Sequence, residues 1–329
     1  MRALAATFAL TSSVISAVPA SATKAAEVEP RAEPAEFALA ERIGDKVEED
    51  STIELYVSFH DLSSPLVATV LEGVERGVRV DDADARLIGP PHPDAELQSE
   101  QLELVLGRAD GIAVSPGSAP ALVPVIDRAI EMGVPVVTFG SDSPASARLA
   151  FVGEDLVESG RVAGRLLADA LGNEGRVLLT TSDAAATWSR ERERGAREVF
   201  ATLTGIDIAH TLDAGSERGA MDAAIDEAMR VHGDIDGVLA LGCCTTPAVG
   251  SWVRRHDAAD RVHVVGFELL EQTIELVADG AIDATVAPAH ERQALEAVTL
   301  LGRAVDGKPI RDLDTGVTVY TTEDIYDGL

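Results

Sequence analysis

The chain has 329 residues, of which 46% are hydrophobic and 25% are charged. These values are typical of a globular protein with two medium lobes or one large α/β unit, and they exclude a disordered chain, a collagen and a coiled coil. The 27 basic and 56 acidic residues give a net charge of −29, which disfavours binding to nucleic acid and to anionic lipid.

The first residues have the pattern of an export signal. Arg2 precedes an uncharged, mostly apolar run over residues 3–18, and Pro-Ala-Ser-Ala follows at positions 19–22. We therefore predict a secretory signal peptide over residues 1–22 and a periplasmic location, with a short amphipathic helix as the alternative. Residues 23–51 are rich in Ala, Glu and Pro and are expected to form an acidic tether.

Strand and helix patterns alternate from residue 52 to the C-terminus. Apolar runs typical of buried strands lie at 53–57, 111–114, 134–139, 176–179, 237–241 and 262–267. Amphipathic stretches typical of helices lie at 66–78, 119–132, 190–203, 248–255 and 272–279. Continuous apolar strands separated by helices predict an α/β fold whose parallel sheets are covered on both faces. Because the rhythm runs twice, we expect two similar Rossmann-like lobes.

The loops after these strands are the candidate binding loops, since ligands of such sheets bind beyond the carboxyl ends of the strands. They are 58–65, 139–148, 181–192, 241–247 and 267–271. The sequence has neither a GxGxxG or GxxxxGK[ST] phosphate loop nor a GxSxG elbow, and His290-Glu291 lacks the second His of a metalloprotease helix. We therefore expect no enzymatic activity, no cofactor and no metal ion.

Several segments in consistent order resemble one family of binding proteins. They are 110–117 (DGIAVSPG), 125–139, 141–144, 150–155, 192–195 (RERG), 264–268 (VVGFE) and 315–324. Together they resemble the periplasmic sugar-binding proteins of ABC transporters, which share the ribose-binding, type I periplasmic binding protein fold. The resemblance covers about residues 52–329.

The resemblance implies two lobes with a hinge and a ligand cleft between them. The implied crossings between lobes lie near 154–156, 287–290 and 313–316. The corresponding lobes are 52–154 plus 290–314 at the N-terminal side and 155–289 plus 315–329 at the C-terminal side. Chain alternation alone predicts the two lobes, whereas only the resemblance supplies the crossings and the cleft.

Three charged residues are the expected polar contacts of the ligand. Arg192 matches the sugar-binding Arg of the family, although it could be a surface residue of a helix start. Glu268 stands where the family has Asp, although it could satisfy free amides of a helix N-terminus. Gly140 stands where the family has another Asp, so Asp142 is expected to bind hydroxyls instead, unless it caps its own turn.

The first loop departs most from the family, which often has Asn-Pro-aromatic-aromatic there. This chain has Ser-Pro-Leu-Val at positions 64–67, and Pro288 replaces a Gln that often binds ligand. Trp188 is expected either to supply a ring from the other lobe or to pack under its loop. The remaining expected ligand-binding residues are Asp61, Ser64, Phe139, Ser141 and Phe267.

Cys243 and Cys244 are the only cysteines of the chain and are adjacent. An even count in an exported protein favours a disulfide, but neighbouring α-carbons lie about 3.8 Å apart, below the roughly 4.4 Å lower limit of ordinary bridges. We hypothesise a strained vicinal disulfide that forms an apolar plate against the ligand. The alternative is two free thiols that behave as small hydrophobic groups.

These features predict an exported, monomeric solute-binding protein. We expect it to capture a small neutral sugar or short polyol between its lobes and to deliver it to an ABC permease. A sensor component that presents a sugar-like signal to a chemoreceptor or kinase would have the same sequence. A hydrolase is disfavoured by the missing nucleophile motif, and a transcription regulator is excluded if the chain is cut after Ala22.

Overall fold

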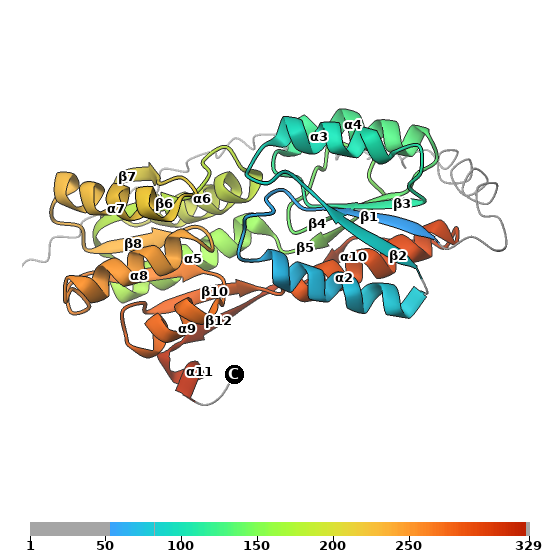
Figure 1. Cartoon of the computed structure of the whole chain (residues 1–329). Coiled ribbons are helices and arrows are strands. Elements are labelled where there is room, and N and C mark those ends of the chain that lie inside the picture. The colour runs from blue at the N-terminus through green and yellow to red at the C-terminus, as the bar shows by residue number, and fades with distance from the viewer. Residues whose placement is uncertain (1–52, 82, 327–329) are drawn as a thin grey trace, which may run out of the picture.

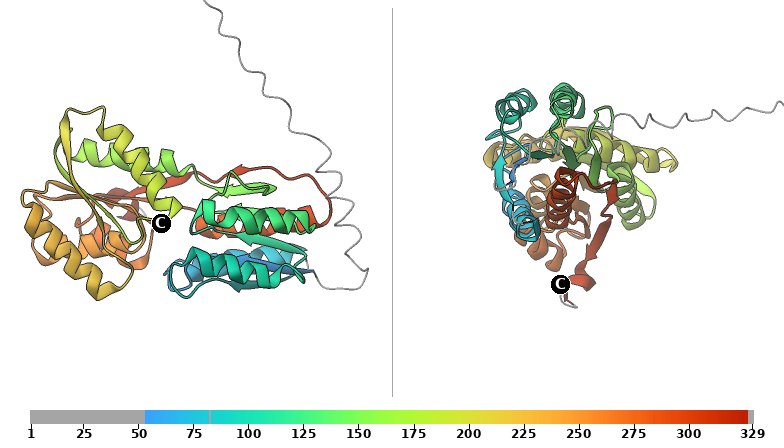
Figure 2. Two further views of the ribbon diagram at one scale, coloured as in Figure 1. Left: turned by 90° about the horizontal axis from the view of Figure 1, so that it is seen from above. Right: turned by 90° about the vertical axis from the view of Figure 1, so that its right-hand side faces the viewer.

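The computed structural model describes residues 53–81 and 83–326. The expected signal peptide over 1–22 and the acidic tether over 23–51 lie outside these residues. The described chain forms two α/β lobes, each built on one six-stranded sheet (Figure 1). The view from above in Figure 2 shows the lobes arranged end to end. Within the described ranges, every helix is too short or too polar to cross a membrane.

The N-terminal lobe has a parallel sheet with the strand order β11-β5-β4-β3-β1-β2. Its strands are β1 (Glu54–Ser58), β2 (Asp84–Ile88), β3 (Gly111–Val114), β4 (Val136–Phe139), β5 (Ala150–Gly153) and β11 (Leu313–Asp314). Helices cover both faces (Figure 1): α2 (Val67–Asp81) and α10 (His290–Val305) lie on one, α3 (Ala95–Val105) and α4 (Ala119–Glu131) on the other.

The three central residues of β1 are all apolar because both faces of the sheet are covered. Successive side chains of a strand point to opposite faces of the sheet. Leu55 and Val57 therefore pack in the core beside α2 and α10, whereas Tyr56 packs in the core beside α3 and α4. All three are at most 1% exposed, because helices cover both faces.

The C-terminal lobe has the strand order β12-β10-β9-β8-β6-β7, in which only β12 is antiparallel to its neighbour. Its strands are β6 (Glu174–Thr181), β7 (Gly205–Asp213), β8 (Gly237–Ala240), β9 (His263–Phe267), β10 (Ala284–Pro288) and β12 (Val317–Thr321). Its helices are α5 (Leu156–Ala170), α6 (Thr187–Phe200), α7 (Arg218–His232), α8 (Thr245–Arg255), α9 (Glu271–Ala278) and α11 (Thr322–Tyr326).

The same two-sided burial holds in this lobe. Val177 and Leu179 of β6 pack in the core that α5 and α6 supply, and Leu178 packs in the core of α7, α8 and α9. The alternating α/β fold expected from the sequence is confirmed, with one parallel and one mostly parallel sheet. The edge strands β2 and β7 were not predicted, because their side chains alternate between partly buried and exposed and leave no continuous apolar run.

The chain passes between the two sheets at three points. It leaves the N-terminal sheet after β5 for α5, returns from β10 to α10, and crosses again between β11 and β12. The first connection is short, because Asp155 directly caps α5 by accepting hydrogen bonds from the backbone of Val157 and Glu158, both at 2.9 Å. Loops at the strand ends of both lobes therefore come together beside these connections.

Candidate ligand-binding site

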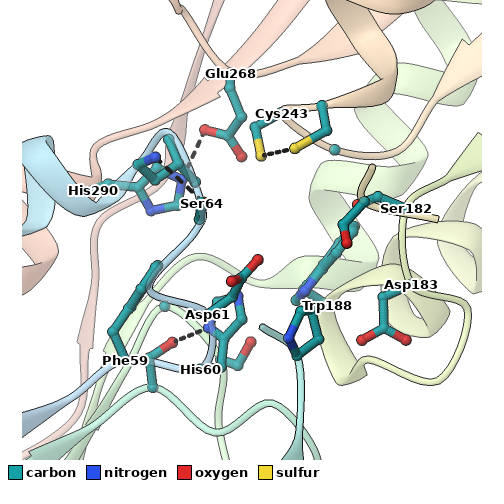
Figure 3. A pocket seen from close by; sticks show the side chains of 18 of the residues that line it. Phe59, His60, Asp61, Ser64, Ser182, Asp183, Trp188, Cys243, Glu268 and His290 are labelled. Atoms are coloured by element: carbon teal, nitrogen blue, oxygen red, sulfur yellow. Dashed lines mark hydrogen bonds and ion pairs between the residues drawn. The ribbon is translucent and has the colours of Figure 1, made fainter. Parts of the chain in front are cut away.

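A pocket lies between the two lobes, beyond the carboxyl ends of strands from both sheets (Figure 3). About 760 Å³ of space lies between its atoms, the open mouth included. The residues that line it are Phe59, His60, Asp61, Ser64, Leu66, Pro93, Ser115, Phe139, Gly140, Ser141, Leu156, Ser182, Asp183, Trp188, Arg192, Ser216, Gly242, Cys243, Cys244, Glu268 and His290. This is the position at which α/β sheets generally bind small molecules.

The structure brings together most of the ligand-binding residues expected from the sequence. Those that line the pocket are Asp61, Ser64, Phe139, Ser141, Trp188, Arg192, Cys243, Cys244 and Glu268. Two expected residues, Asp142 and Phe267, do not line it. Both side chains instead contact other residues of the protein beside the pocket.

Asp142 holds its own loop, so the hydroxyl-binding role expected for it is corrected. Its carboxylate accepts hydrogen bonds from the Thr138 hydroxyl and the Ser143 backbone, both at 2.7 Å. Arg148 donates to both of its oxygens, at 2.5 and 2.7 Å. Because these partners use the carboxylate fully, Asp142 fixes the loop after β4 and offers the pocket no free acceptor.

Phe267 lies under the binding residues and not in the pocket wall, which corrects the second expectation. Its side chain is fully buried in the core beside α5 and α6. The guanidinium carbon of Arg192 lies 4.0 Å from the centroid of the Phe267 ring. A cation at this distance over a ring is attracted to its face, so Phe267 positions Arg192 from below.

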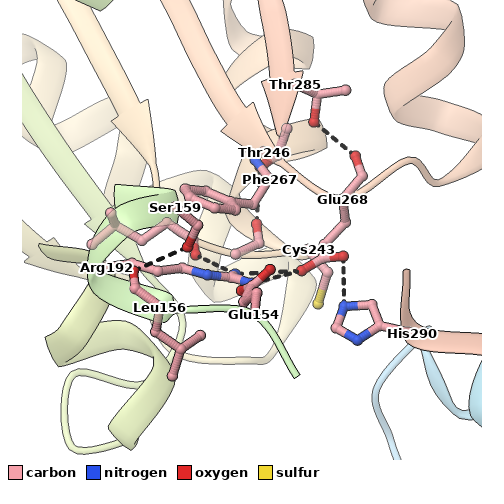
Figure 4. Close-up of polar contacts among 12 residues, drawn as sticks. Glu154, Leu156, Ser159, Arg192, Cys243, Thr246, Phe267, Glu268, Thr285 and His290 are labelled. Atoms are coloured by element: carbon pink, nitrogen blue, oxygen red, sulfur yellow. Dashed lines mark hydrogen bonds and ion pairs between the residues drawn. The ribbon is translucent and has the colours of Figure 1, made fainter. Parts of the chain in front are cut away.

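Arg192 is the centre of a buried charge network (Figure 4). Its side chain is 4% exposed, and its Nη2 donates to Glu154 at 2.6 Å. Its Nη1 donates to the Leu241 carbonyl at 3.0 Å and lies 3.3 Å from Glu268 Oε1. Both carboxylates are almost fully buried, so one positive and two negative charges meet away from water, and Arg192 alone leaves one negative charge uncompensated.

Two glycines set the position of Arg192 by allowing α5 and α6 to pack closely. A Cβ on Gly195 would lie 1.9 Å from the Val157 carbonyl oxygen, and a Cβ on Gly160 would lie 2.1 Å from the Arg192 carbonyl oxygen. No larger residue fits without a shift of backbone. The RERG segment therefore supplies both the binding residue and the glycine that places its helix.

Glu268 joins this network to the second connection between the lobes. Its backbone has the left-handed φ of 76°, which is uncommon for a residue with a side chain. The conformation is held by its amide, which donates to the Val286 carbonyl at 2.9 Å, and by the Thr285 hydroxyl, which donates to its carbonyl at 2.8 Å. Its Oε2 then lies 2.7 Å from Nε2 of His290, at the start of α10.

Burial and neighbouring charges compete in setting the ionisation of the network. Burial alone would lower the pKa of His290, but the neighbouring Glu268 and Glu154 carboxylates raise it above its ordinary value. Burial alone would raise the pKa of Glu268, but His290 and Arg192 hold it below its ordinary value. The pKa of Glu154 is raised, because burial outweighs the attraction of Arg192. When all four side chains are ionised, the two carboxylates and the two basic groups of the network have no net charge.

The loop after β1 forms the opposite wall. The Phe59 ring stacks on Phe139, with centroids 6.4 Å apart and planes inclined by 21°. Burial lowers the pKa of His60 to about 4, so its imidazole is neutral, and its Nδ1 lies 3.2 Å from the Ser115 hydroxyl. The aromatic platform that is absent from positions 64–67 is thus partly supplied by Phe59, directly after the strand.

Trp188 and the two cysteines lie at one glycine loop. A Cβ on Gly242 would lie 2.8 Å from the Trp188 ring, so only glycine lets this ring lie against the loop. Cys243 and Cys244 follow, both partly buried, with their sulfurs 3.4 Å apart as free thiols. The hydrogen bond to Cys244 and burial raise the pKa of the Cys243 thiol. The pair therefore presents two sulfurs to the pocket.

Several lining residues were missed by sequence reasoning, above all His290, Asp183, His60 and Phe59. Pro288 replaces a polar residue of the family and cannot make its side-chain contact. Two residues later, His290 supplies a polar side chain from the same connection between the lobes. Asp183 follows β6 within an expected binding loop, so its position after the strand was a usable signal. Within residues 53–81 and 83–326, no three His, Cys, Asp or Glu side chains are grouped to hold a metal ion.

The lobes also touch across the pocket, away from the three connections. The Thr187 amide donates to the Gly117 carbonyl at 3.2 Å, and the Ala119 amide donates to the Thr187 hydroxyl at 2.9 Å. Thr187 begins α6 in one lobe, and Ala119 begins α4 in the other. One threonine thus makes two hydrogen bonds that hold the lobes together.

A two-lobed α/β fold with a pocket between the lobes is the architecture of periplasmic binding proteins. Residues 55–309 match the periplasmic binding protein domain family, and the chain belongs to this family. Because this match covers most of the described residues, the family resemblance expected from the sequence is confirmed.

Individual relatives are distant. The chain is 23% identical to the ribose import binding protein of Bacillus subtilis over 79% of this chain and 82% of that protein. It is also 23% identical to the xylose/arabinose-binding protein of Sulfolobus acidocaldarius, over 73% and 63% of the two chains. The structure superposes on a glucose-galactose binding protein from Geobacillus stearothermophilus with a TM-score of 0.79 and 23% identity, covering 84% and 99% of the chains.

A second solved structure is similar over a comparable share of the chain. It is a solute-binding protein of an ABC transporter from Burkholderia graminis in complex with D-arabinose, with a TM-score of 0.80 and 22% identity, covering 85% of this chain and 98% of that one. At such identities the similarity establishes the fold of both lobes.

Proposed function

We propose that this protein is an exported binding protein that captures a small sugar or short polyol and delivers it to an ABC permease. The observation that carries the proposal is a pocket whose polar groups come from both lobes, with Arg192 and Glu268 on one side and Asp61 and Ser64 on the other. A ligand held by both sides binds the closed arrangement better than an open one. The sugars in the names of the relatives support this ligand class.

The capture step is a closure of the two lobes. Hydroxyl groups of the ligand exchange water for carboxylate acceptors and guanidinium donors, while Trp188 and Phe139 cover its carbon atoms. The hydrogen bonds of Thr187 across the pocket add to the same closed state. The three connections would act as the hinge, and the closed shape is what a permease would recognise.

The lining residues favour a compact ligand. Glu268 is one methylene longer than the Asp of the family and lines the pocket from its fixed backbone. The sulfurs of Cys243 and Cys244 fill another part of the wall. A short acyclic polyol or a small monosaccharide therefore fits this proposal better than an oligosaccharide.

A thermal-shift screen over pentoses, hexoses and alditols tests the proposal. At least one compound should raise the melting temperature of the purified protein in a concentration-dependent way. The increase should be lost in Arg192→Ala and kept in Arg190→Ala, which removes an exposed arginine from the same helix. If no compound shifts the transition, or if both variants respond alike, the proposed site is wrong.

Export and the monomeric state belong to the same proposal. Because cleavage is expected after Ala22, N-terminal sequencing of the protein recovered from the periplasm should give Thr23-Lys24 as its first residues. Recovery of a chain that still carries residues 1–22 would contradict the expected signal peptide.

Gel filtration of the mature protein should give the size of a single chain, and a dimer would contradict the monomeric state.

The vicinal disulfide between Cys243 and Cys244 remains part of the proposal. Both sulfurs line the pocket, 3.4 Å apart and unbonded in the structure, and an exported protein would meet an oxidising compartment that can join them. Thiol titration of the unfolded, unreduced protein should therefore find no reactive thiol. Two reactive thiols would show that the pair acts as two free, weakly polar groups in the pocket wall.

A further inference from the structure

The charges of the pocket are not balanced within the described residues. Three carboxylates line it, from Asp61, Asp183 and Glu268. Glu268 is compensated by Arg192 and His290, at 3.3 and 2.7 Å. The ion pairs of the described chain leave Asp61 and Asp183 without a basic partner.

Asp61 is a buried carboxylate with one oxygen in use. It is 9% exposed, and its Oδ1 accepts hydrogen bonds from the amide and the hydroxyl of Ser63, at 2.9 and 2.6 Å. No hydrogen bond from the described residues reaches its Oδ2. One oxygen thus fixes the side chain and the other is free for a ligand, in a place where water is scarce.

Asp183, on the opposite lobe, also has one carboxylate oxygen in use and one open. Its Oδ1 accepts hydrogen bonds from the amides of Ala185 and Ala186, at 2.9 and 3.2 Å, and this holds the turn before α6. Its Oδ2 accepts none from the described residues. Figure 3 shows the side chains of Asp61 and Asp183 at the pocket together with Trp188.

The bases at the pocket are already engaged. Arg192 and His290 together face two carboxylates, Glu154 and Glu268. His60 lines the pocket beside Asp61 but is neutral, because burial lowers its pKa to about 4. The pocket therefore keeps two negative charges that no group of the protein in the described ranges neutralises.

Closure over a neutral ligand would leave these two charges buried. Hydroxyl groups can donate hydrogen bonds to both carboxylates, but they bring no charge, and burying an uncompensated charge is costly. A protonated amine supplies hydrogen bonds and one of the two missing positive charges together. Trp188 adds an aromatic face, which attracts cations as well as carbon chains.

We propose that the preferred ligand is a hydroxyl-rich compound that bears a protonated amine, such as an amino sugar or an amino polyol. The inference rests on the proposed function and narrows its ligand class. The amine lies within reach of Asp61, Asp183 or both, while the hydroxyl groups use the remaining polar side chains. The strongly negative net charge of the chain, −29, favours the approach of such a cation.

Matched pairs of ligands test the inference by calorimetric titration of the wild-type protein. The pairs are D-glucosamine with D-glucose, D-galactosamine with D-galactose, and 2-amino-1,3-propanediol with glycerol. In at least one pair the amine should bind about tenfold more tightly or better than its hydroxyl counterpart. N-acetyl-D-glucosamine, which keeps the nitrogen but loses the charge, should bind no better than glucose.

Two variants locate the amine. Asp61→Asn and Asp183→Asn keep the shape of each side chain and remove its charge, and Asp260→Asn removes an exposed charge elsewhere. At least one of the first two should bring the amine and hydroxyl members of the pair to within about threefold. Asp260→Asn should leave the difference unchanged, and melting curves report whether each variant is folded.

The outcomes separate this inference from the proposed function. Binding of a neutral sugar or polyol, with no amine bound more tightly than its hydroxyl counterpart, overturns the inference and leaves the proposed function intact. A preference for the amine that survives in both Asp61→Asn and Asp183→Asn also overturns it. If neither neutral nor amine compounds bind to the wild-type protein, the proposed function itself fails.

Discussion

Two groups of charged residues at the pocket are held in opposite ways. Around Arg192, acids and bases neutralise one another, and each is held by further contacts from the fold. At Asp61 and Asp183, one carboxylate oxygen is held and the other is left open within the described residues. The comparison teaches that paired buried charges form a scaffold whose members keep fixed positions at the pocket, whereas an unpaired carboxylate leaves the ligand an open acceptor.

The largest change in stability is expected when Arg192, which pairs with both buried carboxylates of the network, is replaced. Arg192→Ala leaves Glu154 and Glu268 buried with less compensation, so the free energy of unfolding should fall by about 3–5 kcal/mol. Urea unfolding measures the change, and Arg190→Ala, on the exposed side of α6, is the control. Equal stability of the two variants would mean that the network does not act as a paired unit.

A smaller and pH-dependent effect is expected at His290. Its pKa is raised in the folded protein, so its contribution to stability is fully present below its unfolded value of about 6.5 and is lost as pH rises through its folded value. His290→Gln should therefore lower stability by about 1.5–3 kcal/mol near pH 6, and by less as the pH rises.

Melting curves of wild type and variant between about pH 6 and 9 measure this difference. His92→Gln, at an exposed position, is the control and should show no such trend. A difference that grows with rising pH would contradict the charged pair between His290 and Glu268.

The placement of the scaffold can be tested without touching a charge. In Gly195→Ala the added Cβ meets the Val157 carbonyl oxygen, so α5 and α6 must separate and stability should fall by about 1–3 kcal/mol. Ligand-induced stabilisation should fall too, because Arg192 moves with α6. Gly107→Ala adds a Cβ in open space and should change neither property; a response common to both variants would argue against close helix packing as the cause.

The smallest effect is expected at the contact between the lobes. Thr187→Val removes the hydroxyl that accepts a hydrogen bond from the Ala119 amide, so ligand affinity should fall about three- to tenfold. Stability should change little, because each lobe keeps its core. Titration calorimetry compares this variant with Thr204→Val, which alters an exposed threonine. Unchanged affinity would show that this contact does not contribute to the closed state.

Sequence patterns were sufficient for the class of fold because two-sided burial leaves a strong signal. Strands such as β1 and β8 are buried over almost their whole length, and the helices between them are amphipathic. The edge strands β2 and β7 carry a weaker signal, since their side chains are only partly buried or exposed. Hence the two lobes were predictable, although the edge strands β2 and β7 were not, and neither were the buried inner strands β5 and β10.

The site was predictable only where a residue and its position are linked along the chain. Arg192 and Glu268 lie within recognisable segments, directly beside the elements that place them. His290 reaches Glu268 only through the connection between the lobes, and no local pattern reports that contact. Asp142 binds Arg148, which lies only six positions later in the sequence. This contact was not predictable, because it depends on how the loop between the two residues folds.

Fluorescence of Trp188 during a ligand titration tests the central claim most directly. Trp188 lines the pocket, whereas the second tryptophan, Trp252, is buried in the core of the C-terminal lobe. A sugar, a polyol or one of their amine counterparts should change the emission in a saturable way, and the change should vanish in Trp188→Phe but persist in Trp252→Phe. No saturable change with any of these compounds, in protein that is folded, would contradict a ligand-binding pocket between the lobes.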